Sequence, residues 1–289
     1  MTISIGMLIP PKLGGLGVEA VAGWAKAQGL DALDLPVDFS AAAQACKTNG
    51  LRLGAVWGAS QSQLLNPDES KRAEAVRALQ SQIQAMPAVG ATVLFLCLVP
   101  ENYSQSIADS LAIYRETFPA IAATCEQAGV RAVFEGWPGP APLYPTLGCT
   151  PETWRAMFAA VPSAALGLNY DPSHLVRLGI DYLRVLDEFK ARVYHCHGKD
   201  TALLAEAQYL YGHARPALDK PPSFSEGAWR YCVPGDGLVD WSQVAYRLEQ
   251  AGYGGCVSIE LEDARYWGSV EKEQAGLAKA HRHLARHFA

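Results

Sequence analysis

Several features that mark other classes of protein are missing from this 289-residue sequence. Its seven cysteines form no C-x-x-C pair and are odd in number, which argues against a disulfide framework and against a thiolate zinc site. No apolar run approaches the roughly 18 residues of a membrane span. The N-terminus shows no basic segment followed by a long apolar run, as a signal peptide would. We therefore expect a cytoplasmic protein with no membrane partner.

An excess of positive charge is also missing. The sequence has 24 lysine and arginine residues against 29 aspartate and glutamate residues, which gives a formal net charge of −5. Because proteins hold the nucleic-acid backbone chiefly through lysine and arginine, this balance leaves no general basic surface for it. We expect no nucleic-acid partner.

What the sequence does contain is a regular alternation of apolar, β-branched runs with longer helical patterns, which is typical of βα units around a parallel sheet. Eight units, and a length near the roughly 250 residues of a (β/α)8 barrel, predict an α/β fold with one TIM-barrel domain over residues 1–289. The expected strands are residues 2–8, 32–37, 52–58, 91–98, 131–137, 164–171, 191–198 and 255–262. The expected helices are residues 18–28, 40–49, 68–87, 104–128, 150–161, 175–189, 240–252 and 270–288.

Specific residues mark several helix ends. Thr150 followed by Pro151, and Asp240, place a capping side chain before a helical run. Gly129 and Gly252 fall where helices should stop, because glycine adopts the left-handed backbone of a helix C-terminus without strain. These signals indicate where three of the expected helices begin or end.

Residues 201–238 do not fit the alternation of strands and helices. The segment is rich in proline, glycine and aromatic residues, and it follows the seventh expected strand. Long loops in a compact barrel are usually functional, and this one leaves the face at which barrels bind ligands. We predict a long loop after strand 7 that covers the active site; the alternative is an ordered surface excursion with no role in substrate binding.

Metal-type ligands stand where four of the expected strands end. They are Glu135, Asp171, His197 and Glu260, with gaps of 36, 26 and 63 residues (171 − 135, 197 − 171, 260 − 197). The carboxyl ends of the strands meet at one face of a barrel, and several buried carboxylates are costly unless a cation neutralises them. The pattern predicts one divalent ion at this face.

Four further residues are candidates for substrate contact. His174 lies three residues after Asp171, and its side chain is within reach of a substrate hydroxyl. His195 shares a strand face with His197, because side chains alternate with a period of two; it is a substrate contact, a support for the ligand, or an inward histidine with its own partner. Lys199 is either a substrate contact or half of a surface ion pair with Asp200. Trp137 is either packing or a ring that stacks on a sugar.

The order of these motifs resembles the xylose isomerase-like TIM-barrel superfamily, and more narrowly its sugar phosphate isomerase/epimerase branch. The resemblance runs from Glu135 to the C-terminus; the first half is similar only in its βα rhythm. The segments that carry it are NYDPSHL (169–175), HCHGKDT (195–201), VPGDG (233–237) and SIELED (258–263).

The resemblance implies one divalent ion, Mn²⁺, Mg²⁺ or Co²⁺ with Zn²⁺ as a further candidate, held by Glu135, Asp171, His197 and Glu260. His197 is preferred to its neighbour because it holds the histidine place in the family's His-x-Lys-Asp pattern. In related ketose 3-epimerases the two glutamates at these positions also exchange the substrate proton from opposite sides. We take Glu135, Glu260 and His174 as the candidate catalytic residues.

One departure from the family pattern bears on the substrate. Gly136, Trp137 and Pro138 follow Glu135, where relatives in this branch more usually have Asn-Cys-Pro. The change lies beside the expected ligand rather than at it. It therefore affects the identity of the substrate more than the binding of the metal.

The expected activity is that of a metal-dependent isomerase or epimerase acting on a small-molecule sugar or sugar derivative. A sugar α-hydroxycarbonyl can chelate one cation, which then stabilises the enediolate formed when the carbon acid loses its proton. The alternative is a lyase, similar to inosose dehydratase or to keto-glycoside-cleaving relatives, because elimination begins with the same proton transfer. A homo-oligomer is compatible with the sequence.

One motif points to a different function. Residues 15–20 read G-x-G-x-x-A after the first strand, and Asp34 and Asp38 follow about twenty positions later, as in an NAD-binding fingerprint. Residues 10–13 separate these glycines from the strand, whereas the fingerprint needs them in the turn itself. We therefore regard NAD binding as the weaker hypothesis and expect no dinucleotide cofactor.

The same residues argue against two other functions. An abasic-site endonuclease of the superfamily would need further histidines for a multinuclear zinc site and a basic groove, and neither is visible in the sequence. A sugar-binding barrel with a degraded site is disfavoured because all four expected ligands are present.

Overall fold

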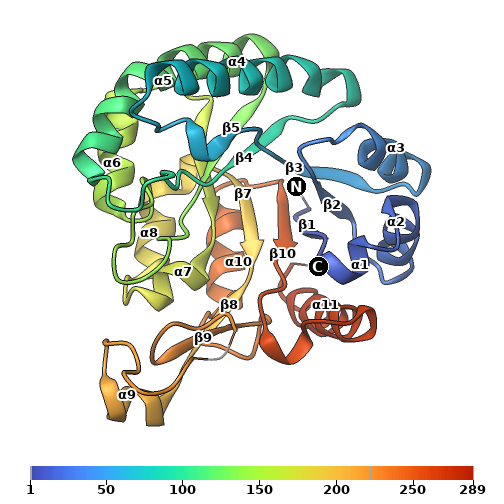
Figure 1. Cartoon of the computed structure of the whole chain (residues 1–289). Coiled ribbons are helices and arrows are strands. Elements are labelled where there is room, and N and C mark those ends of the chain that lie inside the picture. The colour runs from blue at the N-terminus through green and yellow to red at the C-terminus, as the bar shows by residue number, and fades with distance from the viewer. Residues whose placement is uncertain (1, 222, 289) are drawn as a thin grey trace.

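The structure, a computed structural model, describes residues 2–221 and 223–288. Eight parallel strands form a closed barrel in which each strand pairs with the next along the chain and the last pairs with the first (Figure 1). The strands are β1 Ser4–Met7, β2 Ala32–Leu35, β3 Arg52–Trp57, β4 Val93–Leu96, β5 Arg131–Glu135, β6 Leu166–Tyr170, β7 Val193–Gly198 and β10 Cys256–Ile259. The predicted fold class, a (β/α)8 barrel, is confirmed.

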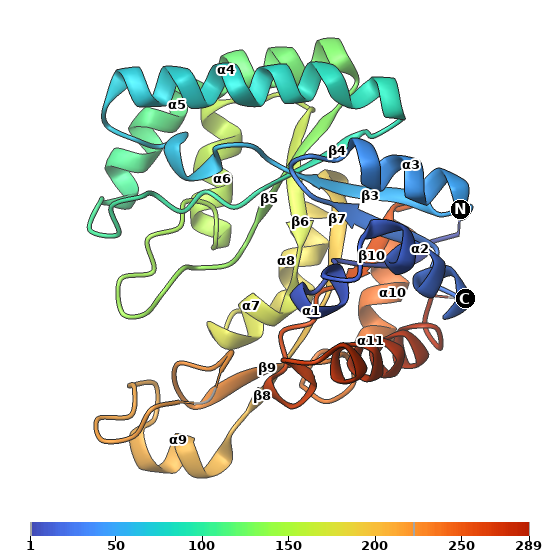
Figure 2. The same cartoon turned by 45° about the vertical axis from the view of Figure 1, so that its right-hand side comes forward.

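Helices cover the outside of the barrel (Figures 1 and 2). Because helices and barrel interior bury both faces of the strands, most strand residues are buried and apolar, as expected for a parallel sheet. The longer helices are α2 Val18–Ala27, α3 Ser40–Thr48, α4 Glu69–Ala85, α5 Ile107–Ala128, α6 Pro151–Ala160, α8 Tyr182–Phe189, α10 Trp241–Gln250 and α11 Val270–Leu284. Three short helices are α1 Pro11–Gly14, α7 Pro172–Arg177 and α9 Ala205–Tyr211.

The predicted helix-end signals are confirmed. The Thr150 side chain accepts a hydrogen bond from the backbone N–H of Thr153, and Asp240 caps α10 in the same way. Gly129 and Gly252 follow α5 and α10 with φ of 67° and 69°, a left-handed backbone that only glycine adopts readily.

One predicted helix is wrong in its extent. Residues 175–189 are not a single helix, because α7 begins earlier, at Pro172, and a break separates it from α8. Asp171 caps α7 by accepting a hydrogen bond from the Ser173 backbone N–H at 2.8 Å, and Gly179 breaks the chain with φ of 70°. Asp-Pro is the same start signal as Thr-Pro at 150–151, and it places His174 in the first turn of a helix next to Asp171.

Residues 201–238 are also more ordered than the predicted loop. Strand β8 Asp200–Leu203 pairs antiparallel with β9 Trp229–Cys232, with Thr201 opposite Tyr231, and α9 lies between them. In both Figure 1 and Figure 2 this excursion, which we call the hairpin arm (residues 200–232), projects from the barrel with α9 at its far end. No residue of α9 is buried. Beyond its base, the hairpin arm contacts the segment after β5 through Arg215, which donates a hydrogen bond to the Ala141 carbonyl, and through Glu226, which accepts one from the Ala141 N–H.

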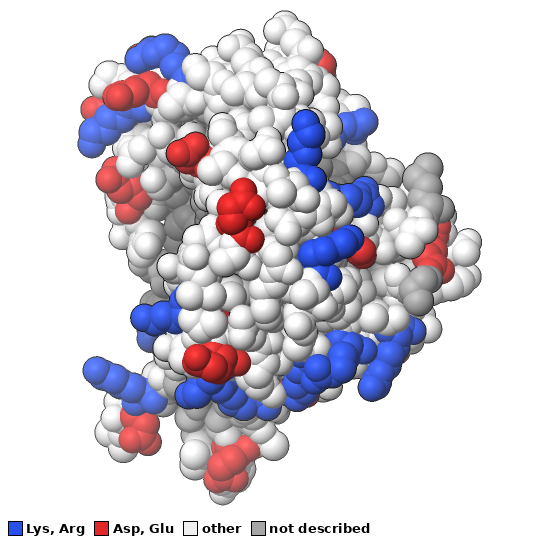
Figure 3. All heavy atoms as spheres, turned by 90° about the vertical axis from the view of Figure 1, so that its right-hand side faces the viewer, with Lys and Arg blue, Asp and Glu red and all other residues white. Residues whose placement is uncertain are grey.

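Charged side chains of both signs share the surface of the molecule. On the face shown in Figure 3, basic side chains gather across the lower part and acidic ones lie around and above them. Within residues 2–221 and 223–288, no helix combines the length and the apolar character needed to cross a membrane.

Candidate metal centre

The four expected ligands lie at the carboxyl ends of four consecutive barrel strands. Glu135 ends β5, Asp171 follows β6, His197 is the penultimate residue of β7, and Glu260 follows β10. Strands β5, β6, β7 and β10 are neighbours in that order, so the four side chains converge on one side of the barrel mouth. All are buried except Glu260, which is partly exposed.

One nitrogen of His197 lies between the two glutamates. His197 Nδ1 is 3.2 Å from Glu135 Oε2 and 3.2 Å from Glu260 Oε2. The nearest Asp171 oxygen, Oδ2, is 3.8 Å from the same nitrogen. Ligands at roughly 2.0–2.2 Å from a tetrahedral or octahedral ion lie about 3 Å from one another, so this spacing suits a single shared ion.

Hydrogen bonding gives a second reason to place a cation here. Glu135 Oε1, Asp171 Oδ2 and His197 Nδ1 are buried atoms with no partner in hydrogen-bond geometry, although His174 Nε2 is only 3.0 Å from Glu135 Oε1. Each buried polar atom left unpaired costs about 1–3 kcal/mol. Carboxylate oxygens with one imidazole nitrogen form a donor set that Mn²⁺, Mg²⁺, Co²⁺ and Zn²⁺ accept. The residues present therefore fit one divalent ion.

The surrounding charges keep both glutamates ionised. Burial acts to raise the pKa of Glu135, but the close imidazole rings of His174 and His197 hold it well below its usual range. Burial acts on Glu260 in the same way, and there the charges of Lys199 and His197 lower the pKa to about 2. Two ionised carboxylates side by side favour a cation between them and are in the protonation state of a general base.

Lys199 lies inside this cluster rather than on the surface. Its side chain is 2% exposed, and Nζ is 3.2 Å from Asp171 Oδ2, 3.0 Å from Glu262 Oε2 and in contact with Glu260. The predicted alternative, a surface ion pair with Asp200, is therefore wrong. Asp200 is buried as well and accepts hydrogen bonds from the backbone N–H groups of residues 201, 235 and 239, which fixes the base of the hairpin arm.

His174 connects the expected ligands to the hairpin arm. Its Nε2 is 3.0 Å from Glu135 Oε1 and 3.3 Å from Asp171 Oδ2, and its Nδ1 lies 2.6 Å from the Tyr231 hydroxyl. Arg177, one turn further along α7, donates a hydrogen bond of 3.0 Å to the same hydroxyl. The hairpin arm thus reaches the site through one tyrosine on β9.

His195 occupies a different part of the interior. Its Nε2 is 3.1 Å from Asp34 Oδ2, and it does not line the cavity beside the expected ligands. Asp34 also accepts hydrogen bonds from the Ala55 backbone N–H at 2.8 Å and the Ser258 hydroxyl at 2.9 Å, and lies 3.8 Å from His197 Nε2. Of the interpretations given above, this position favours an inward histidine with its own partner.

Three residues of the site were missed in the sequence analysis. Asn169 donates a hydrogen bond to Glu135, Tyr231 contacts His174, and Asp34 holds His195. Asp34 interrupts the otherwise apolar strand Ala32–Leu35, which was a usable signal, but it was considered only as part of the NAD fingerprint. Gly54 on the neighbouring strand makes room for it, since a Cβ there would lie 1.9 Å from Asp34 Oδ1.

The geometry of residues 15–20 does not match a dinucleotide site. Gly15 lies eight residues beyond the end of β1 (15 − 7 = 8), after the separate helix α1. The closed barrel also lacks the switch point of an open sheet at which such cofactors bind. This arrangement argues against NAD binding.

A cavity of about 350 Å³, which we call the metal-site cavity, opens beside the expected ligands, two of which line it. Glu135, His174, Lys199 and Glu260 line it, together with Trp137, which therefore lies where a stacking ring was expected. The volume is in the range of small-molecule sites.

The sequence model of the family described as xylose isomerase-like TIM barrel matches residues 12–287. The chain belongs to the xylose isomerase-like TIM-barrel family. The resemblance found in the sequence is thereby confirmed at the level of the superfamily.

Curated relatives of this xylose isomerase-like barrel include inosose dehydratases. An inosose dehydratase of Geobacillus thermodenitrificans (strain NG80-2) is 34% identical over 115 residues, which are 39% of this chain and 36% of that protein. The alignment thus spans about a third of the length of this curated relative. Its reaction is therefore not assigned to this chain by similarity.

Solved structures match over nearly the whole barrel. An L-ribulose 3-epimerase superposes with a TM-score of 0.73 at 14% identity, covering 99% of this chain and 94% of that one. The IOLI protein, whose structure contains a zinc atom, superposes with a TM-score of 0.68 at 15% identity, covering 98% of this chain and 96% of the other. Identities this low establish the fold alone.

Proposed function

We propose that this chain is a metal-dependent sugar isomerase or epimerase of the sugar phosphate isomerase/epimerase branch. The observation that carries the proposal is the placement of Glu135 and Glu260, which approach one His197 nitrogen at equal distances of 3.2 Å from strands β5 and β10. Two strands, β6 and β7, lie between these two in the barrel. Two carboxylates that reach one point from different strands suit a reaction in which one removes a proton from a substrate carbon and the other returns it.

Glu135, Asp171, His197 and Glu260 would hold one divalent ion, Mn²⁺, Mg²⁺ or Co²⁺, with Zn²⁺ as a further candidate. Such an ion supplies positive charge that stabilises negative charge on a substrate oxygen while the neighbouring carbon loses its proton. The protein groups orient the substrate and move the proton. Asn169 fixes Glu135 through its amide, which leaves the second carboxylate oxygen directed at the cavity.

The other polar groups of the cavity suit recognition of sugar hydroxyls. Lys199 Nζ holds the carboxylates of Glu260 and Glu262, which can accept hydrogen bonds from hydroxyls, and His174 Nε2 lies close to Glu135 and Asp171. Trp137 presents a ring to the same cavity, where it would stack on the apolar face of a sugar. The proposed substrate is a small sugar or sugar derivative that carries an α-hydroxycarbonyl, and the proposed setting is the cytoplasm.

Exchange of solvent hydrogen into the substrate tests this reaction. Protein loaded with Mn²⁺ is incubated in D₂O with a panel of keto-sugars and inososes, and recovered compounds are examined by NMR and mass spectrometry. We expect deuterium on the carbon next to the carbonyl, together with the epimer or isomer. A panel in which no compound acquires deuterium, even with metal bound, would contradict the proposal.

A lyase is the second candidate, favoured by the position of His174. Elimination needs an acid that protonates the leaving β-substituent in addition to the base that removes the proton. His174 lies against Glu135 at 3.0 Å and against the Tyr231 hydroxyl at 2.6 Å, so a second proton carrier stands beside the first. In the same D₂O experiment, release of water or of an aglycone in place of an epimer identifies the lyase.

A further inference from the structure

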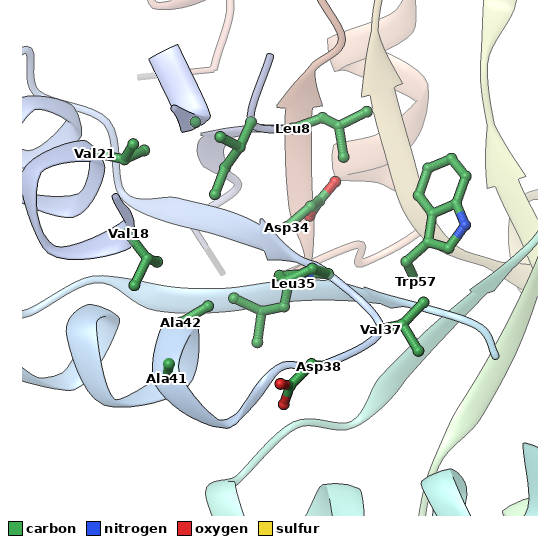
Figure 4. Close-up of a pocket in the computed structure, with 13 residues that line it drawn as sticks. Leu8, Val18, Val21, Asp34, Leu35, Val37, Asp38, Ala41, Ala42 and Trp57 are labelled. Carbon is green, nitrogen blue, oxygen red and sulfur yellow. The ribbon is translucent and has the colours of Figure 1, made fainter. Parts of the chain in front are cut away.

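A second and larger cavity lies beside the metal-site cavity. It has a volume of about 560 Å³ and lies between the carboxyl ends of β1 and β2 and the helices α2 and α3 (Figure 4). Val18 and Val21 of α2, Leu35 of β2 and Ala42 of α3 line it. We call it the apolar side pocket.

The apolar side pocket adjoins the cavity that Glu135 and Glu260 line. Trp57, at the end of β3, lines both. Because both cavities meet the Trp57 side chain, a substituent that extends past this ring from the cavity of Glu135 and Glu260 would reach the apolar side pocket.

The lining of the apolar side pocket excludes most polar ligands. Its two carboxylates are Asp34, which already accepts hydrogen bonds from His195 and Ser258, and Asp38, at the outer edge near the start of α3 (Figure 4). No lysine or arginine is among the described residues that line it. Sugar hydroxyls there would lose water without gaining partners, and an anionic group would meet two carboxylates.

We propose that the apolar side pocket binds a neutral apolar substituent of the substrate, an aryl or alkyl group attached to the sugar ring that lies against the metal centre. This assignment rests on the proposed function and narrows its substrate class to unphosphorylated sugar derivatives with such a group. Lys199 is consistent with it, because three carboxylates surround this cation of the metal-site cavity and leave it no charge for a phosphate.

Binding of fluorinated probes tests the pocket without knowledge of the natural substrate. The full-length protein with Mg²⁺ is titrated with 4-fluorophenol and with 4-fluorophenyl β-D-glucopyranoside, and ¹⁹F NMR line widths give the affinities. Methyl β-D-glucopyranoside, added as a competitor, reports the sugar alone. We expect the aryl glucoside to bind at least about tenfold more tightly than the methyl glucoside, because a phenyl ring buries much more apolar surface.

A matched pair of variants locates the site of binding. Val37 lines the apolar side pocket and its side chain is 44% exposed, so Val37→Asp adds a charge to the pocket without disturbing the core. Leu238, which is 55% exposed and lies between β9 and α10, gives the control Leu238→Asp. We expect Val37→Asp to weaken both fluorinated probes at least about fivefold at an unchanged Tm, and Leu238→Asp to leave them unaffected.

The outcomes separate this inference from the proposed function. Equal affinities of the aryl and methyl glucosides would overturn the proposal that the apolar side pocket binds an apolar substituent. Binding of the aryl glucoside that Val37→Asp does not weaken would overturn it as well. Failure of 4-fluorophenol to bind, combined with a lower molecular mass in light scattering for Val37→Asp, would also overturn it by showing that a second copy covers the surface. If EDTA changes neither glucoside affinity while 4-fluorophenol still binds, the pocket stands and the metal-dependent function fails.

Discussion

The two halves of the barrel mouth carry different side chains. The second half, strands β5, β6, β7 and β10, presents charged and metal-type groups: Glu135, Asp171, His197 and Glu260. The first half, strands β1 to β4, presents mainly apolar ones: Leu8, Leu35, Trp57 and Phe95. The difference shows how one face of a barrel can divide two functions. Charged side chains are needed where a proton is transferred, and apolar side chains suit the binding of the rest of the substrate.

The largest expected effect is loss of the metal from the second half. Wild-type protein should carry about one divalent ion per chain after incubation with Mn²⁺, and Asp171→Ala or Glu135→Ala should remove it, because each leaves the site one ligand short. Trp57→Ala, in the first half, should keep the ion. Elemental analysis gives the metal content of the wild type and the three variants. An absence of metal from the wild type would contradict both the proposed metal centre in the second half and the proposed mechanism.

The next effect concerns proton transfer. Glu260→Gln keeps the shape of the side chain and one coordinating oxygen but cannot accept a proton, so it should retain appreciable metal while the rate falls on the order of 10²-fold or more. Glu271→Gln, on the exposed face of α11, is the control. His197→Ala should lose metal and rate together. Equal loss of metal in Glu260→Gln and His197→Ala would indicate that Glu260 serves only as a ligand.

A smaller effect is expected from the hairpin arm. Removal of residues 207–227, which lie outside the barrel strands, should leave the barrel folded and should raise the KM about tenfold or more if the arm covers the site. Tyr231→Phe keeps the arm and removes only the hydroxyl near His174. KM and kcat of both variants measure the effect on substrate binding and turnover, and circular dichroism shows whether each variant is folded. Unchanged kinetics in a well-folded deletion would make the arm a surface excursion.

His195 joins the two halves and should have a modest effect on the rate. His195→Ala removes the partner of Asp34 but no expected ligand, so the ion should remain and activity should fall only in part. The free energy of unfolding should decrease by about 3–5 kcal/mol, because Asp34 is left buried with less compensation. Metal content and urea unfolding measure these. If His195→Ala empties the site while His197→Ala leaves it full, the choice between the two histidines is wrong.

The smallest effect is a pH dependence of stability outside both halves. Burial acts to raise the pKa of Asp263, but hydrogen bonds from Arg265 and the Val233 backbone N–H lower it below the ordinary value of 3.8. A lowered pKa in the folded state means that the stabilisation is present above about pH 4 and is lost as the pH falls further. Asp263→Asn should lower the free energy of unfolding at pH 6 by about 1 kcal/mol or less and should make it depend less on pH below about pH 4. Urea unfolding of the wild type and the variant between pH 3 and 6 measures this difference. The same pH dependence in both proteins would contradict the role given to Asp263.

Much of the barrel could be predicted from the sequence because its signals are local. Strands buried on both faces appear as continuous apolar runs, and Thr150 and Asp240 cap helices through residues two or three positions away. The clustering of the four candidate ligands was predictable for a related reason: each stands at a strand end, and barrel topology brings all strand ends to one face.

The remaining features depend on contacts between distant residues. Asp34 and His195 are 161 positions apart, and nothing near either residue in the chain indicates the pairing. Lys199 looks like a surface residue because lysine usually is one; only three carboxylates from other strands make its burial tolerable. The hairpin arm was missed because two four-residue strands separated by 25 residues give no hairpin signal (229 − 203 − 1 = 25).

The pairing of β8 with β9 has a consequence for how sequences of this kind can diverge. Thr201 lies opposite Tyr231, and the alternation of side chains directs the tyrosine toward His174. An insertion of one residue within β9 would reverse that alternation and turn Arg230 or Cys232 toward the histidine instead. An insertion at the far end of the arm, near α9, would leave the pairing unchanged. The length of the tip can therefore change without altering the contact between Tyr231 and His174, whereas the number of residues in β9 cannot.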